Sequence, residues 1–196
     1  MENISFHNLY RPGKVVCKNE LFIHYYTREM KLVNDYNEIQ FNRMPSIAEF
    51  ILAEEYLKDF HFNHQQNHLK FCFPDNEPLY PEMINFLCCS NYGNCLMELY
   101  GIHPEQFPKI EKLPDISIQP VTDEQLQTYL AFEYEQDIKY GRGFAEEKQN
   151  QNKKNFQNEK ILQLLAYYKG KPAGTVTAII SEHTVELDNL IVLESL

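Results

Sequence analysis

Residues 164–177 read LLAYYKGKPAGTVT, and residues 185–193 read VELDNLIVL. The first stretch joins two apolar runs through Lys-Gly-Lys-Pro, which is the pattern of a hairpin with strands over residues 161–168 and 173–180. The second stretch predicts one more strand, over residues 185–193. The last part of the chain is therefore expected to be a run of three strands.

One strand and two helices are predicted before these strands. Residues 116–119 (ISIQ) predict the strand, and residues 122–125 (TDEQ) form a capping box that predicts the start of the first helix. The apolar positions at helical spacing behind this box are Leu126, Tyr129, Leu130 and Ile138. Gly141 and Gly143 end that helix, and the polar residues 144–159 predict a weak, solvated helix at best. This half of the chain reads β-α-α-β-β-β.

A proline-rich linker at residues 104–115 separates this half from the first half. Pro104, Pro108 and Pro114 block both a helix and a central strand there. The sequence therefore predicts an N-terminal α/β domain over residues 1–103 and a second domain over residues 116–196.

The first half alternates strand and helix signals. Strands are predicted over residues 36–41, 69–73 and 95–102. Ser46 and Glu49 form a capping box for one helix, and a second helix follows Pro81. Its inward side chains are expected to be Met83, Ile84, Phe86 and Leu87. The sum is a β-α-β-α-β unit, with a hairpin or edge strands around residues 15–23.

Composition limits the classes of function. The 196 residues are 43% apolar, which is enough for a core in one large or two small domains. The chain has 28 acidic and 18 basic residues, a net charge of −10, and no basic patch, so it is expected to bind neither nucleic acid nor a membrane. The start of the chain does not resemble a signal peptide. Five cysteines, an odd number, favour a reduced, cytoplasmic protein, and Cys88 and Cys89 are predicted to be buried, inert thiols.

The order of elements and the two quoted stretches resemble the opening of the GNAT N-acetyltransferase fold over residues 116–196. Residues 164–177 look like the second and third strands of that family. Residues 185–193 look like its fourth strand, along which the pantetheine of acetyl-CoA runs. The resemblance implies an α/β (α+β) fold with a mixed sheet flanked by helices. It also implies transfer of an acetyl group from acetyl-CoA to an amine of a small molecule or peptide.

The same resemblance implies roles for residues of the last strand. Glu186 matches the family position that often acts as general base, with Asp188, Glu182 and His183 as alternatives. Leu190, Ile191 and Val192 match the segment whose backbone N–H groups receive the thioester oxygen and pantetheine. A strand that is half exposed to solvent and half buried would account for the same residue types.

The break between the two helices matches the part of the family that shapes the acceptor site. Tyr140, Arg142 and Phe144 would line it, and Arg142 would favour an acidic acceptor. An ordinary helix-breaking loop is the alternative interpretation of the Gly-x-Gly pattern.

One family motif is not found. The Arg/Gln-x-x-Gly-x-Gly/Ala loop that holds the pyrophosphate of coenzyme A would follow Leu196. We therefore expect this chain to bind acetyl-CoA weakly, and a catalytically inactive binding or assembly module is the alternative function. The last strand would also be an unguarded sheet edge, which we expect to be covered by the N-terminal unit or, in a homodimer, by a second copy.

No metal site is predicted. His61, His64 and His68 have no standard zinc spacing, and a polar loop leaving a helix explains them better.

Overall fold

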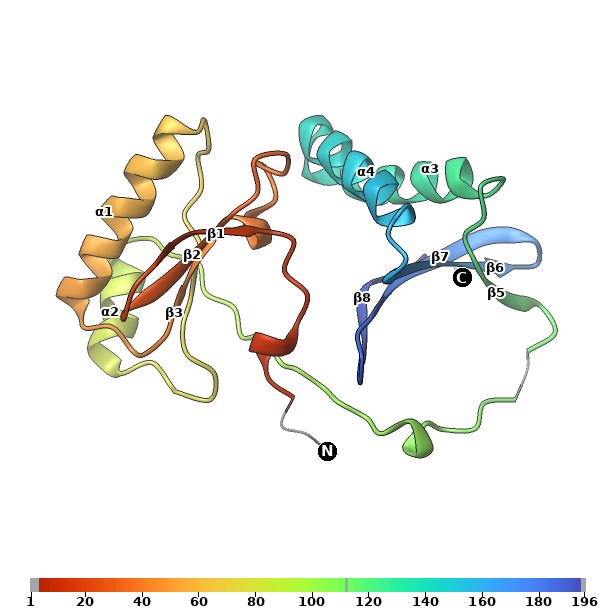
Figure 1. Cartoon of the computed structure of the whole chain (residues 1–196), viewed down its shortest axis with the longest axis horizontal. Coiled ribbons are helices and arrows are strands. Elements are labelled where there is room, and N and C mark those ends of the chain that lie inside the picture. Colours follow the sequence, from red (N-terminus) through yellow and green to blue (C-terminus); the bar gives the residue numbers. More distant parts are fainter. Residues whose placement is uncertain (1–3, 112, 195–196) are drawn as a thin grey trace. The chain divides into compact units, whose positions relative to one another are not determined.

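The computed structural model describes residues 4–111 and 113–194. The chain divides into two compact units, Met1–His103 and Pro104–Leu196, and each has its own four-stranded sheet with helices (Figure 1). This combination confirms the predicted α/β (α+β) class.

The N-terminal unit contains three strands before its first long helix. Its elements are η1 (Phe6–Asn8), β1 (Lys14–Lys18), β2 (Phe22–Tyr26), η2 (Asn34–Tyr36), β3 (Glu38–Phe41), α1 (Ile47–Asn63), β4 (Phe71–Cys72) and α2 (Pro81–Cys89). The strand order is β1-β2-β3-β4. The pairs β1–β2 and β2–β3 are antiparallel, whereas β3–β4 is parallel. The hairpin expected around residues 15–23 is confirmed.

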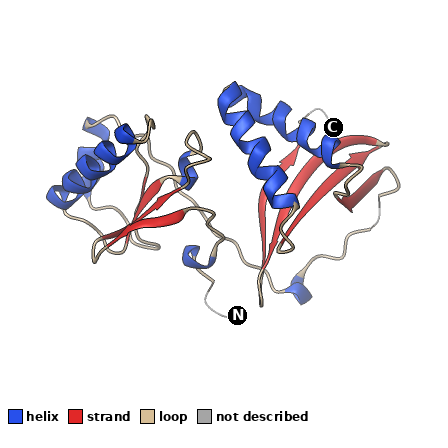
Figure 2. Ribbon diagram, turned by 45° about the horizontal axis from the view of Figure 1, so that its top comes forward, coloured by secondary structure: helices blue, strands red, loops and turns tan. Residues whose placement is uncertain are grey.

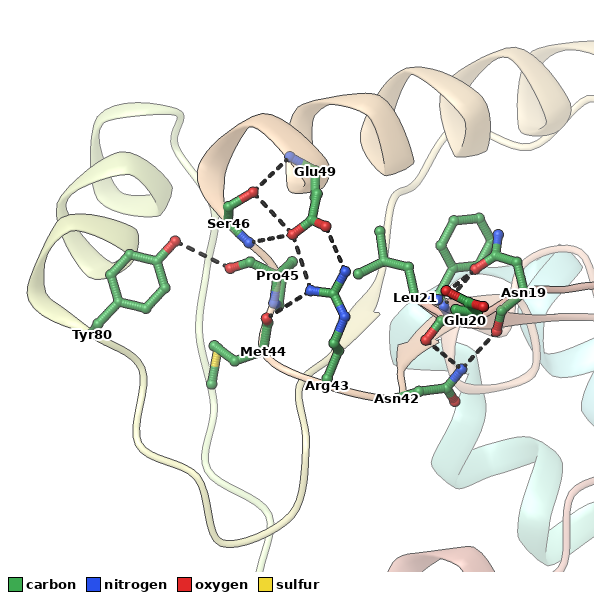
Figure 3. A network of polar contacts seen from close by, with 11 residues as sticks. Asn19, Glu20, Leu21, Asn42, Arg43, Met44, Pro45, Ser46, Glu49 and Tyr80 are labelled. Atoms are coloured by element: carbon green, nitrogen blue, oxygen red, sulfur yellow. Dashed lines mark hydrogen bonds and ion pairs between the residues drawn. The ribbon is translucent and has the colours of Figure 1, made fainter.

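Helix α1 begins at the predicted capping box. The Glu49 backbone N–H donates to the Ser46 hydroxyl at 3.3 Å, and the Ser46 backbone N–H donates to the Glu49 carboxylate at 2.8 Å (Figure 3). Arg43 forms an ion pair with the same carboxylate at 2.5 Å. The Tyr80 hydroxyl, just before α2, donates to the Pro45 carbonyl at 3.1 Å. The starts of the two helices are thus tied to the same turn of chain.

The core of the N-terminal unit is rich in aromatic rings. Its buried apolar side chains are Phe22, Ile39, Phe41, Phe50, Ala53, Leu57, Met83 and Leu87. The Phe50 ring of α1 lies 4.7 Å from the Phe71 ring of β4, centroid to centroid, and this contact packs α1 against the sheet. Ile84, expected to point inward, is exposed.

Two further expectations for this unit are wrong. Residues 95–102 form no strand, and Leu96 and Tyr100 are more than 80% exposed, so the unit reads β-β-β-α-β-α rather than β-α-β-α-β. Apolar and polar residues alternate there as in a strand. A strand also needs a neighbouring strand for its backbone hydrogen bonds, and the described sheet ends at the two-residue β4. Cys88 and Cys89 are exposed rather than buried, because α2 ends at this point.

The C-terminal unit has the predicted β-α-α-β-β-β order. Its elements are η3 (Pro104–Gln106), β5 (Ile116–Pro120), α3 (Leu126–Asp137), η4 (Ile138–Tyr140), α4 (Arg142–Phe156), β6 (Ile161–Tyr168), β7 (Lys171–Ile180) and β8 (Val185–Val192). The sheet order is β5-β6-β7-β8, and every pair is antiparallel, so the described residues of this unit do not form the mixed sheet that the resemblance implies.

The helices of this unit differ from expectation at two places. Helix α4 is a regular helix of 15 residues instead of a weak one, since its Glu, Gln and Lys residues favour helix and its buried face is anchored to the sheet. The Gln163 side chain of β6 donates to the Asn152 carbonyl of α4 at 3.0 Å. Helix α3 begins at Leu126, after a turn in which the Thr122 N–H donates to the Gln125 side chain at 3.2 Å.

The two faces of the C-terminal sheet differ in polarity. Helices α3 and α4 lie over one face (Figure 2). The opposite face carries exposed apolar side chains at the alternate strand positions. Examples are Ile118, Leu162, Ile180, Leu187 and Val192. In the part of the chain that the structure describes, no helix is long and apolar enough to cross a membrane.

Candidate functional site

Polar side chains are buried where α3 faces the C-terminal sheet. Tyr129, Glu133 and Asp137 follow one another at four-residue spacing on α3, and all three are buried. The buried polar side chains of the adjoining strands are Gln163 on β6 and Thr175 and Thr177 on β7. Burial of polar groups costs free energy unless each is hydrogen-bonded, so such a layer indicates a specific role more than a contribution to stability.

Glu133 is the centre of this layer. Its side chain is fully buried, its Oε1 accepts a hydrogen bond from the Thr175 hydroxyl, and its Oε2 accepts one from the Asn189 side-chain amide at 2.8 Å. Burial raises the pKa of Glu133, while the hydrogen bonds from Thr175 and Asn189 act in the opposite direction. One carboxylate thus connects α3 to both β7 and β8.

Strand β8 is bulged at the residue that Glu133 holds. Across the β7–β8 pair, Thr175 faces Ile191 and Thr177 faces Asp188, so three steps of β8 span two steps of β7. Asn189 lies within this bulge and has the left-handed backbone conformation, with φ of 52°. Asparagine tolerates this conformation better than most residues, and bulges of this kind are frequent beside active sites.

Gly174 allows the bulged strand to approach β7 closely. A Cβ atom at this position would lie 2.5 Å from the Ile191 carbonyl oxygen and 3.4 Å from the Val192 Cα. The first distance is far below van der Waals contact. Glycine is therefore required at position 174 by the path of the β8 backbone.

The residues predicted as catalytic lie on β8 or on the turn before it. Glu186 is half-buried and faces Ile179, and Asp188 is exposed and faces Thr177, so both belong to the sheet face that α3 and α4 cover. Glu182 and His183 are exposed, and His183 Nε2 lies 3.8 Å from Glu182 Oε1.

The segment predicted to bind pantetheine follows the bulge. Leu190 and Val192 are about 70% exposed, and Ile191 is half-buried against β7. Strand β8 is the last in the sheet order, so its outer backbone groups have no strand partner among the described residues. The predicted segment thus lies along an open sheet edge.

The predicted acceptor residues cluster at the junction of α3 and α4. Gly141, with φ of 109°, separates the helices, as predicted. The rings of Tyr140 and Phe144 lie 5.3 Å apart, centroid to centroid. Arg142 is exposed and forms an ion pair with Glu146 at 2.7 Å. Any acidic ligand of Arg142 would have to replace this carboxylate.

Glu133, Thr175 and Asn189 are not among the site residues predicted from the sequence. A signal was present on α3, where Glu133 and Asp137 continue the helical spacing of Tyr129 with acidic instead of apolar residues. No signal of this kind marks Asn189, since its role depends on the bulge.

His61, His64 and His68 make hydrogen bonds to backbone carbonyls. His61 Nδ1 lies 2.6 Å from the His68 carbonyl, His64 Nδ1 lies 2.7 Å from the Phe60 carbonyl, and His68 Nε2 lies 3.2 Å from the Asn37 carbonyl. The His61 bond joins the end of α1 to the loop that follows it, and the His68 bond joins this loop to Asn37, the residue before β3. Within residues 4–111 and 113–194, no three His, Cys, Asp or Glu side chains are placed to hold a metal ion.

Acid is expected to destabilise the N-terminal unit through His24. Burial, with smaller effects of His61 and His64, lowers the pKa of this histidine from 6.5 to about 4. Below pH 6.5 His24 therefore binds a proton in the unfolded chain but stays neutral in the folded unit. The free energy of unfolding falls as the pH drops from 6.5 towards 4. The loss at pH 5 is about 2 kcal/mol from His24 alone.

Urea unfolding of this unit at pH 8 and pH 5 measures the effect. In His24→Gln the difference between the two pH values should shrink by most of that amount. The lowered pKa values of His61 and His68 act in the same direction, so some acid sensitivity should remain. An unchanged difference in His24→Gln would contradict the assignment.

Comparison with known proteins gives a fold and no activity. Residues 4–100 match a family described as a domain of unknown function (DUF5613). A crystal structure of a functionally unknown conserved protein from Staphylococcus epidermidis ATCC 12228 is similar, with a TM-score of 0.80 and 21% sequence identity. The match covers 98% of this chain and 77% of the solved chain. No curated protein matches the sequence.

Proposed function

We propose that this chain carries the opening half of a GNAT-type N-acetyltransferase, which transfers an acetyl group from acetyl-CoA to an amine of a small molecule or peptide. The observation that carries the proposal is the bulge at Asn189 on an edge strand, next to a buried carboxylate. It supports the role that the family resemblance gives to residues 190–192.

An open strand edge suits the donor. Pantetheine is an extended chain with amide groups, and such a chain can add to a sheet edge through backbone hydrogen bonds, as peptides do. The Ile191 carbonyl faces Gly174 of β7, so of these two residues Val192 has its backbone N–H on the open edge. A Val192 N–H directed at the thioester oxygen would stabilise the charge that develops there in the transition state. The bulge matters because it interrupts the regular pairing of the strand at this position.

The remaining chemistry is assigned to residues on either side of this edge. Glu186 accepts the proton of the acceptor amine, directly or through water, so that the neutral amine attacks the thioester carbonyl. The thiol of coenzyme A leaves, and the acetyl group remains on the amine. Tyr140, Arg142 and Phe144 bind the acceptor, and the exposed guanidinium of Arg142 favours an acidic one.

Two thioester donors test the proposal. We expect acetyl-CoA and S-acetylpantetheine to bind with similar, weak affinity, because residues 190–192 would contact only the pantetheine arm that both contain. Isothermal titration measures the binding. Mass spectrometry of a panel of amines measures acetyl transfer, and it avoids the thiol reagents that would react with the exposed Cys88, Cys89 and Cys95.

The outcomes are distinct. Binding of both donors with acetylation of any amine supports the proposal. Failure of both donors to bind at millimolar concentration would overturn it. Tight binding of acetyl-CoA alone would show that the adenosine pyrophosphate has a site elsewhere, and would contradict the role of residues 190–192 as the main donor contact.

A catalytically inactive assembly module is the second candidate, and the exposed apolar sheet face favours it. Ile118, Leu187 and Val192 belong to this face, and contiguous apolar surface is typical of interaction sites. A second copy of the chain is the partner to test. Light scattering that gives twice the monomer mass, and the monomer mass for Leu187→Lys, together with no acetyl transfer, would support this function over the enzyme.

A further inference from the structure

We infer that Glu133 is a positioning residue that holds Asn189 in the left-handed conformation and thereby fixes the bulge of β8. The consequence for acyl transfer rests on the proposed function, since it concerns the backbone of residues 190–192. The conformational consequence does not depend on it.

The hydrogen bonds of Glu133 carry the inference. In a regular strand Asn189 would point away from the face that contains Asp188, but the bulge turns its side chain back towards α3. There its amide donates to Glu133 Oε2 at 2.8 Å. Glu133 is fully buried, whereas Asn189 is half-buried, so loss of this bond would leave a buried carboxylate oxygen without its donor.

The second oxygen of Glu133 sets the position of the carboxylate. Oε1 accepts a hydrogen bond from Thr175, whose backbone pairs with Ile191 across β7 and β8. Thr175 is itself buried, with 3% of its surface exposed. The Glu133 carboxylate therefore connects Thr175 of β7 to Asn189, the bulged residue of β8.

A carboxylate is specifically suited to this place. Both oxygens accept, and both partners donate, so every hydrogen bond has the correct polarity. In Glu133→Gln one oxygen becomes an NH₂ group, which would face either the Asn189 amide or the Thr175 hydroxyl. Against Asn189 two donors would meet, and against Thr175 the hydroxyl would have to reverse its role.

Hydrogen exchange of residues 188–192 in the whole chain tests the conformational role. We expect Glu133→Gln to speed exchange of those amides of this stretch that face β7 by about tenfold or more, as expected for loss of a partly buried, charge-assisted hydrogen bond. The outward-facing amides of this edge strand should exchange rapidly in both proteins. Glu135→Gln, an exposed position on the same helix, is the matched control and should leave the exchange unchanged. Equal exchange in Glu133→Gln and the wild type would overturn the inference.

Two substitutions of Asn189 separate positioning from general stability. Glycine adopts the left-handed conformation without a side chain, whereas valine strongly disfavours it. Asn189→Gly should keep most of the protection of residues 188–192, and adding Glu133→Gln to it should change little more. Asn189→Val should lose the protection. Equal losses in the glycine and valine variants would overturn the positioning role, even if Glu133→Gln did not fold.

Donor binding then tests the functional consequence separately. For the variants that fold, we expect the KM for S-acetylpantetheine to rise at least fivefold in Glu133→Gln, with the KM for the amine unchanged. An unchanged donor KM would overturn the functional part of the inference. A wild-type chain that transfers no acetyl group would overturn the acetyltransferase proposal, while the exchange data would still decide the role of Glu133 in the bulge.

Discussion

Glu186→Gln is expected to lower the kcat of acetyl transfer by about 10²–10⁴, the range that general-base catalysis contributes. Glutamine has nearly the same shape but cannot take up the proton of the amine. The loss should be largest at low pH, where the acceptor amine is protonated and most dependent on the base. A pH series of kcat for the variant and the wild type measures both effects.

The neighbouring acidic residues make this test specific. Asp188→Asn, Glu182→Gln and His183→Gln examine the three alternative bases, one exposed on the same strand and two on the turn before it. Glu194→Gln, an exposed position beyond β8, controls for the loss of one negative charge. A kcat loss below about threefold in Glu186→Gln would remove this residue from the role, and a large loss in one alternative would transfer it.

Local sequence signals predicted most elements of the fold. The reciprocal pair Ser46 and Glu49 set the start of α1, and Gly141 set the break between α3 and α4. Both depend on a few adjacent residues and on backbone geometry that the residue type itself dictates. For the same reason the run of strands β6 to β8 could be predicted from its hairpin and alternation.

Elements that depend on distant partners could not be predicted. Residues 95–102 have the alternation of a strand, but whether a sheet edge is available to them is a property of the tertiary structure. Helix α4 was underestimated because its sequence is polar, while its anchor to the sheet comes through Asn152 and Gln163. Residues 95–102 form no strand because no neighbouring strand among the described residues pairs with them. Helix α4 is stabilised by a contact with a different element, strand β6. Neither fact can be read from the local sequence.

The candidate site shows the same limit. Glu186 and residues 190–192 could be named because the resemblance places them along one strand. Glu133 lies 56 positions before Asn189, and their hydrogen bond exists only because the bulge turns Asn189 inward. Asn189 in turn has no strong sequence signature, since asparagine is common in turns and loops of every kind.

Gly174→Ala is expected to destabilise the C-terminal unit by about 3 kcal/mol, at the upper end of the usual range for overpacking. The added methyl group would lie 2.5 Å from the Ile191 carbonyl oxygen, which is a backbone atom and cannot rotate away. Relief requires β8 to move off β7, at the cost of the pairing of Thr175 with Ile191 and of the Glu133 hydrogen bonds to Thr175 and Asn189.

The sign of the measured change is what makes this substitution decisive. Gly174 does not have a positive φ, so alanine could adopt its backbone conformation, and without the clash it would stabilise the unit by about 0.4–1 kcal/mol through the unfolded state. Gly93→Ala, with no atom within 4 Å of the new methyl group, is the matched control and should show no loss. Urea unfolding gives the free energy, and hydrogen exchange of residues 185–192 locates it. A stabilised Gly174→Ala variant would mean that β8 does not approach β7 as closely as the bulge requires, and the arrangement of residues 190–192 on which acyl transfer depends would have to be abandoned.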